Sequence, residues 1–256
     1  MNCRRTGSAQ HRVLGVLILS AACVLGSHAA VASCGDEPEA RVDWTGCTKR
    51  NLMLEQHDLS GAIFQRARLT STRFTGSRLP EAKFGQAELS LASFDGADLQ
   101  RADFEKATGI RTRFAGANLA GARFVSAEFS RAIFSGARLT GAVLTKSEVN
   151  RSDFSGADLS GADFSKAELA RSRLTEAKLT GANFSYSNLA RADLRGAALK
   201  DVDLTGSYLF LTQLAGADLS GAKGLTAEQL GLACGSRETK LPNGLPHPER
   251  WRCDEE

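Results

Sequence analysis

From Leu54 to Leu219, every fifth residue of this chain is a large apolar residue, except Val149, which is smaller, and Gly109, which has no side chain. An α-helix needs apolar residues three and four positions apart, and a strand needs them at every second position, so neither fits a period of five. A period of five requires the chain to turn a corner every five residues and to send one large side chain inward from each edge. The repeat therefore predicts a solenoid with short edges.

The large residues fall into four columns when every fourth unit is read together. The first column, Leu59 to Leu219, is all Leu, the second and fourth are mainly Phe, and the third is mainly Leu. Two residues before each of these sites the chain nearly always has Ala, Ser or Thr, which suit a narrow interior. This alternation establishes a ten-residue super-period and is compatible with four-sided coils that pair as parallel strands about 4.8 Å apart. Some of the small residues are expected to bond a corner backbone group, namely Thr112, Ser147 and Ser172.

Individual units match a known pattern. Ala-Asp-Leu-Ser-Gly (157–161), Ala-Asn-Leu-Ala-Gly (117–121) and Ala-Asp-Phe-Ser-Lys (162–166) resemble the A(D/N)LXX repeat of the pentapeptide-repeat proteins. The resemblance covers residues 52–223 and implies an all-β fold, the right-handed quadrilateral parallel β-helix, a solenoid of about eight coils. Gly109 departs from the pattern, and we expect Ile110 to turn inward to cover the gap.

The N-terminal region has the features of a secretory signal peptide at residues 1–32. Arg4, Arg5 and Arg12 precede an apolar run too short to span a membrane, and Ala30-Val31-Ala32 supplies a small-x-small cleavage pattern. We therefore expect export to the periplasm or the medium, with no transmembrane segment.

The remaining chain divides into three parts. Residues 33–51 are predicted to form an N-terminal cap, because a stack of coils has an open apolar end, and residues 52–223 to form the repeats. In residues 224–256, Thr226 and Gln229 form a capping-box pattern that predicts a short helix to about Ala233. An irregular tail with three prolines follows.

Four cysteines remain outside the predicted signal peptide, and in an oxidising compartment an even number suggests disulfides. Three pairings are formally open. Because the two ends of a long stack lie far apart, Cys34–Cys47 and Cys234–Cys253 are the expected bonds. A lipoprotein is the alternative interpretation, since residues 31–34 resemble a lipobox with Cys34 as the acylated residue.

The sequence contains no recognisable catalytic motif. His57 and His247 lie near opposite ends of the repeats, and Gly-x-Ser-x-Gly, phosphate-binding and Cys-x-x-Cys motifs are absent. The Asp residues before the central sites are dispersed over different edges and are better read as turn-forming residues than as calcium ligands. We predict that the chain is not an enzyme and needs no metal or other cofactor.

Charge bears on the choice of partner. The chain has 32 basic and 29 acidic residues, and removal of the three leader arginines leaves 29 of each (32 − 3). A neutral chain is a poor general binder of nucleic acid and a poor mimic of it. An unidentified protein partner, or a homodimer, is expected instead.

One basic stripe and one aromatic patch are the candidate binding sites. At the end of the third-edge unit the chain repeats an arginine once per coil, at Arg111, Arg131, Arg151, Arg171 and Arg191. Glu128, Glu148 and Glu168 lie three positions earlier, so the stripe is either a docking site for an acidic partner or a ladder that balances its own charge. The patch consists of Tyr208, Phe210 and Leu211, with Tyr186 nearby. It is expected to contact the C-terminal helix, or else a dimer mate or partner.

These features favour an exported, non-catalytic protein that acts as a structural or protein–protein interaction rod. Two alternatives stay open at this point. The resemblance implies one, because some pentapeptide-repeat proteins mimic DNA and bind type II topoisomerases. The other is a lipid-anchored envelope protein of the same fold.

Overall fold

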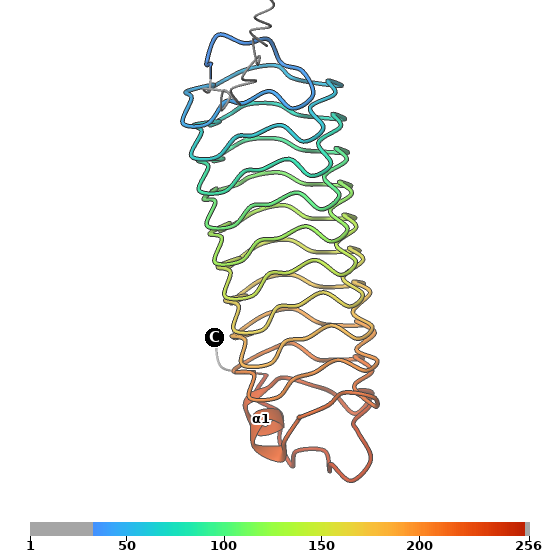
Figure 1. Ribbon diagram of the computed structural model, residues 1–256. Coiled ribbons are helices and arrows are strands. Elements are labelled where there is room, and N and C mark those ends of the chain that lie inside the picture. The colour runs from blue at the N-terminus through green and yellow to red at the C-terminus, as the bar shows by residue number, and fades with distance from the viewer. Residues whose placement is uncertain (1–32, 254–256) are drawn as a thin grey trace, which may run out of the picture. The chain divides into compact units, whose positions relative to one another are not determined.

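The structure, a computed structural model, describes residues 33–253, and the predicted signal peptide lies outside the described residues. Parallel bridges join residues twenty apart, from Asp43 and Ile63 to Asp203 and Lys223. Turns recur every five residues, so each coil has four edges and four corners. Each edge contributes a single bridged residue, which is why this segment has parallel pairing but no extended strand. Figure 1 shows the stacked coils, with the helix α1 (Ala227–Leu232) at their C-terminal end. The predicted all-β solenoid is confirmed.

The interior consists of the large central residues and the small residues two positions before them, and nearly all are fully buried. Phenylalanines of one column stack along the coil axis, with ring centroids 5.1 Å apart for Phe94 and Phe114. Phenylalanines of neighbouring columns meet edge to face, as Phe104 and Phe114 do at 5.6 Å. Aromatic pairs favour both arrangements. Like residues therefore stack on like, as the columns of the sequence predict.

Each corner is a β-turn whose third residue has a left-handed backbone. In one example the Ala62 N–H donates to the Leu59 carbonyl at 3.0 Å, and Gly61 between them has a φ of 67°. Between Arg41 and Gly216 this corner position is occupied by 14 glycines and 22 other residues, all with positive φ. A left-handed conformation costs a residue other than glycine about 1–2 kcal/mol. The backbone conformation therefore does not explain why a corner carries a large side chain.

The Asp or Asn of each repeat caps the following corner. The Asp158 carboxylate accepts the backbone N–H of Ser160 at 3.1 Å, and Asn183 accepts that of Ser185 at 2.9 Å. The pKa of Asp218 is lowered to about 2. The main cause is a hydrogen bond from the hydroxyl of Ser220, two residues later, and the Lys240 ammonium and the Ser220 N–H add to it. A hydrogen bond from the side chain two residues later is also the main reason why the pKa is lowered at Asp58, Asp158, Asp193 and Asp203. The acidic residue of the motif is thus a turn residue, as predicted.

Several buried hydroxyls donate to a carbonyl of the preceding coil, whereas those of Ser187 and Ser207 donate to a carbonyl three residues earlier in their own coil. Thr112 donates to the Leu89 carbonyl at 3.0 Å, and Ser172 donates to the Val149 carbonyl at 2.8 Å, as expected. The expectation for Ser147 is wrong, because its hydroxyl is buried and has no hydrogen-bond partner. Ser147 therefore carries an unsatisfied polar atom at a position where most units have alanine.

The gap at Gly109 is filled by Phe129 and not by Ile110. A Cβ atom at Gly109 would overlap the Thr112 hydroxyl and lie 2.7 Å from the Phe129 ring, so these two side chains occupy the space beside Gly109. Ile110 remains 58% exposed, and the prediction that it turns inward is wrong. Phe129 is the one phenylalanine of a column otherwise built mainly from leucine.

The coils begin earlier than the predicted boundary at residue 52. Asp43 already bridges Ile63, and Trp44, 1% exposed, takes a central site. The Trp44 ring meets that of Phe64 edge to face at 5.8 Å, and the Lys49 ammonium lies 3.9 Å from its centroid. Part of the segment predicted as a cap is therefore a coil, because a tryptophan serves as a central residue although it breaks the repeat's residue pattern.

The C-terminal segment closes the other end of the stack. Thr226 and Gln229 form the predicted capping box, and the Gln229 amide also donates to the carbonyls of Leu204 and Ser207 at 2.9 and 2.8 Å. Leu230 of α1 is fully buried. After α1 the chain rejoins the stack, where Cys234 bridges Gln213.

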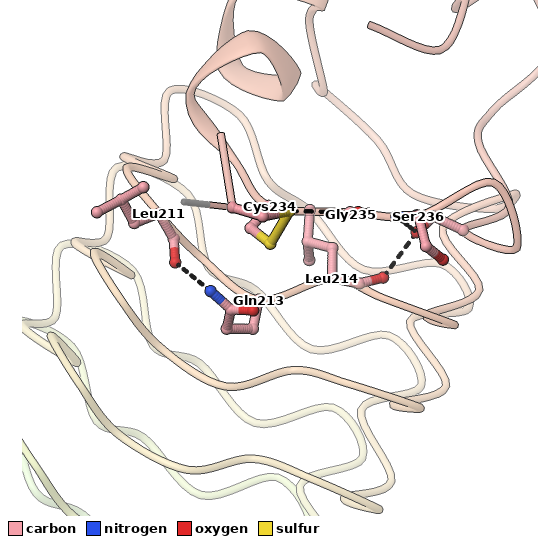
Figure 2. Close-up of a disulfide and its surroundings, with 8 residues drawn as sticks. Leu211, Gln213, Leu214, Cys234, Gly235 and Ser236 are labelled. Atoms are coloured by element: carbon pink, nitrogen blue, oxygen red, sulfur yellow. Dashed lines mark hydrogen bonds between the residues drawn. A yellow bond between two sulfur atoms is a disulfide. The ribbon is translucent and has the colours of Figure 1, made fainter. Parts of the chain in front are cut away.

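Both expected disulfides are present. Cys34 and Cys47 are joined with their Cα atoms 5.5 Å apart, and Cys234 and Cys253 with theirs 4.6 Å apart. Figure 2 shows the second bond beside Leu211, Gln213 and Leu214 of the last coil. Each disulfide thus ties a terminal segment to one end of the stack.

Candidate interaction surface

One side of the stack differs from the others, and we call it the third face. It comprises the outward residues of the third edge and the corners on either side of that edge. Its outward residues include Glu88, Thr108, Glu128, Glu148, Glu168, Asn188 and Tyr208. The corner that follows them carries the five arginines of the predicted stripe, and the corner that precedes them carries Arg66, Lys106, Lys146 and Lys166. A column of glutamates therefore lies between two columns of cations.

Backbone hydrogen bonds to the next coil fix the main chain of the arginine column. The N–H of Arg131 donates to the Asn150 carbonyl at 2.9 Å, and the N–H of Arg171 donates to the Ala190 carbonyl at 2.8 Å. Arg111, Arg131, Arg151, Arg171 and Arg191 all have left-handed backbones, with φ between 57° and 61°. This corner column contains no glycine, although glycine is the residue that its turn geometry favours. Five consecutive coils thus retain arginine at a conformational cost.

The five arginine side chains are exposed, and none is in an ion pair within residues 33–253. Stacked rings place successive coils 4.6 to 5.1 Å apart. At about 5 Å, two like charges repel by up to about 0.8 kcal/mol in water before screening by salt. The column therefore adds electrostatic repulsion to backbone strain.

The glutamate column also stacks like charges on successive coils. Glu128 bridges Glu148, and Glu148 bridges Glu168, so like charges lie directly opposite each other on paired edges, which is unfavourable. Glu168 accepts a hydrogen bond from the Asn188 amide at 2.8 Å, but in the described part of the chain no salt bridge involves these three glutamates. Direct ion pairs between the arginine column and these glutamates, which the alternative interpretation as a self-balancing ladder would favour, are thus absent from the described residues.

The predicted aromatic patch is the C-terminal continuation of the same face. Asn188 bridges Tyr208, and the N–H of Arg191 donates to the Phe210 carbonyl at 2.8 Å. The rings of Tyr208 and Phe210 stack with centroids 6.1 Å apart, and Tyr208 is 49% exposed. The structure therefore brings the two candidate sites, which are separate in sequence, into one continuous surface.

Contact with the C-terminal helix accounts for only one member of the patch. Leu211 is buried, and its N–H donates to the Leu232 carbonyl at the end of α1 at 2.8 Å. Tyr208 and Tyr186 stay exposed, and the Tyr186 ring covers Gly206 of the next coil. The prediction that the helix contacts the patch is thus met at Leu211, while the two tyrosines remain available.

The N-terminal end of the arginine column also carries exposed apolar side chains, which sequence reasoning missed. Leu91 precedes Arg111 in the corner column, is 54% exposed and has a φ of 60°. Its N–H donates to the carbonyl of the exposed Ile110 at 3.0 Å. A leucine in a left-handed, solvent-exposed position combines two unfavourable features. The signal in the sequence was the absence of glycine from this one column.

No metal-binding cluster of histidine, cysteine, aspartate or glutamate side chains occurs in residues 33–253. Over the same residues, no helix is long and apolar enough to cross a membrane.

The stacked coils and the charges of the third face define a class of protein, a four-cornered β-solenoid with one strongly charged face. Two family models extend this result. The model for the pentapeptide repeat region matches residues 147–223, and that for pentapeptide repeats matches residues 50–79, 78–108 and 110–146. Only Gly109 interrupts the match, at the site where the central side chain is missing. The chain belongs to the pentapeptide repeat family.

Solved structures of the family resemble this chain to different degrees. HetL, a pentapeptide repeat protein involved in heterocyst differentiation regulation in the cyanobacterium Nostoc sp. strain PCC 7120, is 28% identical. The match covers 81% of this chain and 94% of HetL, with a TM-score of 0.43. A trypsin-treated form of QnrB1, a plasmid-mediated fluoroquinolone resistance protein, is 18% identical, and the match covers 77% of this chain and 92% of QnrB1, with a TM-score of 0.52. No curated protein matches the chain. The similarity to QnrB1, at 18% identity, shows the fold alone, so the function is argued from the surface.

Proposed function

We propose that this protein is an exported, non-catalytic interaction protein whose third face binds another protein. The observation that carries the proposal is the arginine column, which has a left-handed backbone, stacks like charges and forms no ion pair within the described residues. Glu128, Glu148 and Glu168 beside it form no ion pair there either. The corner geometry does not require the arginines, because glycine would suit these corners better. Strained residues that a fold retains are candidates for function.

Export is supported by the signal-like features of residues 1–32 and by the two disulfides. Disulfides persist in the periplasm and outside the cell and are rare in the cytosol. The family further implies a right-handed helix, and residues 52–223 would form about eight coils of it. Cell fractionation tests the localisation: we expect the processed protein in the periplasm or the medium, and a cytoplasmic full-length chain would contradict it.

The alternatives receive less support. A lipid anchor would need the Cys34 sulfur, which is bonded to Cys47. Labelling with radioactive palmitate should therefore leave the protein unlabelled. Topoisomerase binding by DNA mimicry would need an acidic face, whereas the third face is bordered by cations on both sides. A gyrase supercoiling assay should show no inhibition.

Site-specific photo-crosslinking tests the binding surface itself. Thr108 is an exposed outward residue of the third edge, and no described side-chain hydrogen bond involves it. Benzoylphenylalanine at Thr108 keeps every charge of the face, so it should give a specific crosslinked product in cells. Ala198, an exposed outward residue of the first edge, is the matched control and should give none. Absence of a product at Thr108, or equal products at both positions, would refute the proposal.

A further inference from the structure

We propose that the partner of the third face is a second copy of this chain, packed side by side and pointing in the same direction. This inference rests on the proposed function and specifies the occupant of that surface. An arginine column with one charge per coil is best matched by a carboxylate column with the same repeat. The glutamate column of another copy has that repeat, because both columns are built on the same coils.

The pairing follows from the register of the two columns within one coil. Glu128 and Arg131 belong to the same coil and lie three positions apart, as do Glu148 and Arg151, and Glu168 and Arg171. Consider a two-fold axis parallel to the stack that passes between the two columns. It places the glutamates of each copy opposite the arginines of the other copy at the same height. Each coil thereby pairs with its own equivalent, and every contact occurs twice, as in an isologous interface.

Other face-to-face arrangements are electrostatically unfavourable. A two-fold axis perpendicular to the stack would reverse one copy and set glutamates against glutamates and arginines against arginines. A parallel axis centred on the glutamate column would also set Glu148 of one copy against Glu148 of the other. Juxtaposed like charges suppress such pairings. An axis between the glutamates and the preceding corner would pair Glu148 with Lys146 and Glu168 with Lys166, but it would leave Glu128 opposite Ser126. The charge pattern therefore selects one orientation and favours the offset that pairs glutamates with arginines.

The apolar ends of the face fit the same arrangement. Because a parallel two-fold axis preserves height, Tyr208 and Phe210 of one copy lie level with Tyr208 and Phe210 of the other. The exposed Leu91 and Ile110 are likewise matched at the opposite end. Aromatic side chains are enriched at protein interfaces, and these lie beyond the charged rows. The pairing would thus cover the exposed apolar side chains at both ends of the column.

Charge reversal followed by mixing tests the proposal. The first variant carries Arg131→Glu, Arg151→Glu and Arg171→Glu, so its two central columns are both acidic. The second carries Glu128→Lys, Glu148→Lys and Glu168→Lys, so its columns are both basic. Sedimentation velocity of the protein recovered after export should show a dimer for the unmodified chain, a monomer for each variant alone and a heterodimer for the mixture.

The dimer should also weaken as salt screens the charges. The proposed dimer contains three ion pairs in each direction. If each pair contributes at the lower end of the range for exposed pairs, screening all six should raise the dissociation constant of the dimer about tenfold. A control with Arg138→Glu and Lys178→Glu on the first edge should remain dimeric. Recovery of the heterodimer also shows that both variants are folded.

The outcomes separate this inference from the proposed function. A monomeric unmodified chain, or variants that dimerise unaided, would overturn the second copy as partner. If Thr108 then still crosslinks to a different protein, the interaction surface survives and only its occupant changes. If Thr108 gives no specific product, the proposed function fails as well.

Discussion

Replacing three arginines of the third-face corner by glycine should stabilise the isolated chain. The variant carries Arg131→Gly, Arg151→Gly and Arg171→Gly, at corners whose φ values are 57°, 59° and 61°. Glycine adopts this conformation without strain, and it occupies the equivalent corner position at Gly136 and Gly156. Removal of the side chains also removes repulsion between stacked cations. Both effects raise the free energy of unfolding.

The magnitude follows from two opposing contributions. A left-handed backbone costs arginine about 1–2 kcal/mol, and glycine removes this cost. Glycine also lowers the free energy of unfolding by about 0.4–1 kcal/mol, because it increases the entropy of the unfolded chain. The net gain is about 0.5–1 kcal/mol at each site, or about 1.5–3 kcal/mol for the three sites together. For a chain of this size, the thermal midpoint should rise by roughly 3–12 °C.

Thermal and urea unfolding of the exported protein, at low protein concentration and high salt, measure this gain without a contribution from dimerisation. Gly156→Ala is the matched control: its Cβ would meet no atom within 4 Å, so its expected loss of about 1 kcal/mol reports the backbone conformation alone. A triple glycine variant that is less stable than the unmodified chain would show that the arginines stabilise the fold. The structural reason for assigning them a binding role would then be lost.

Three further perturbations test the interior and the corners. Ser147→Ala should raise the free energy of unfolding by about 1 kcal/mol, because it removes a buried hydroxyl without a partner. Ser172→Ala should lower it by about 1 kcal/mol, because it removes a hydrogen-bonded hydroxyl. Urea unfolding measures both, and equal effects would contradict the difference in hydrogen bonding between the two hydroxyls. Phe134→Ala should cost about 3–5 kcal/mol in the same assay, since the ring is fully buried between stacked neighbours. The pKa of Asp218 falls to about 2 in the folded chain, so its stabilising contribution is complete above pH 3.8 and is lost as the pH drops toward 2. Thermal midpoints measured against pH should decline over that window, less steeply for Asp218→Asn, and an unchanged slope would argue against this hydrogen bond.

The interior of the coils could be predicted from the sequence because inward positions admit few residue types. A leucine or phenylalanine every fifth residue and a small residue two positions earlier define both the edges and their stacking. Departures from the pattern were harder to predict. Gly109 removes a central side chain, and only the three-dimensional packing shows that Phe129 of the next coil fills the space. Ser147 looked equivalent to Ser172, and only the three-dimensional structure distinguishes the bonded hydroxyl of Ser172 from the unbonded one of Ser147.

The ends of the stack were predicted less completely than its middle. Trp44 serves as a central residue of the first coil although it lies outside the repeat pattern, and its ring packs edge to face on Phe64. The helix was predicted because the capping box at Thr226 is a local signal. The return of the chain to the stack at Cys234 was not, because that pairing has no local signature.

For the candidate site, the sequence placed the arginines and the glutamates on the third edge and the aromatic residues beside the last unit of that edge. It did not reveal that the exposed Leu91 and Ile110 belong to the same face. Nor did it reveal that the arginines are unpaired and left-handed. Those two properties favour the docking interpretation of the stripe over the self-balancing ladder.

The central claim is that the third face is an interface between two copies of this chain, and the mass of the product crosslinked from Thr108 in cells tests it most directly. We predict a single product with twice the mass of the processed chain, reduced by charge reversal at Arg131, Arg151 and Arg171 and absent when the crosslinker is at Ala198. No product from Thr108, a product of any other mass, or a product that these reversals leave unchanged would contradict the claim that the partner is a second copy.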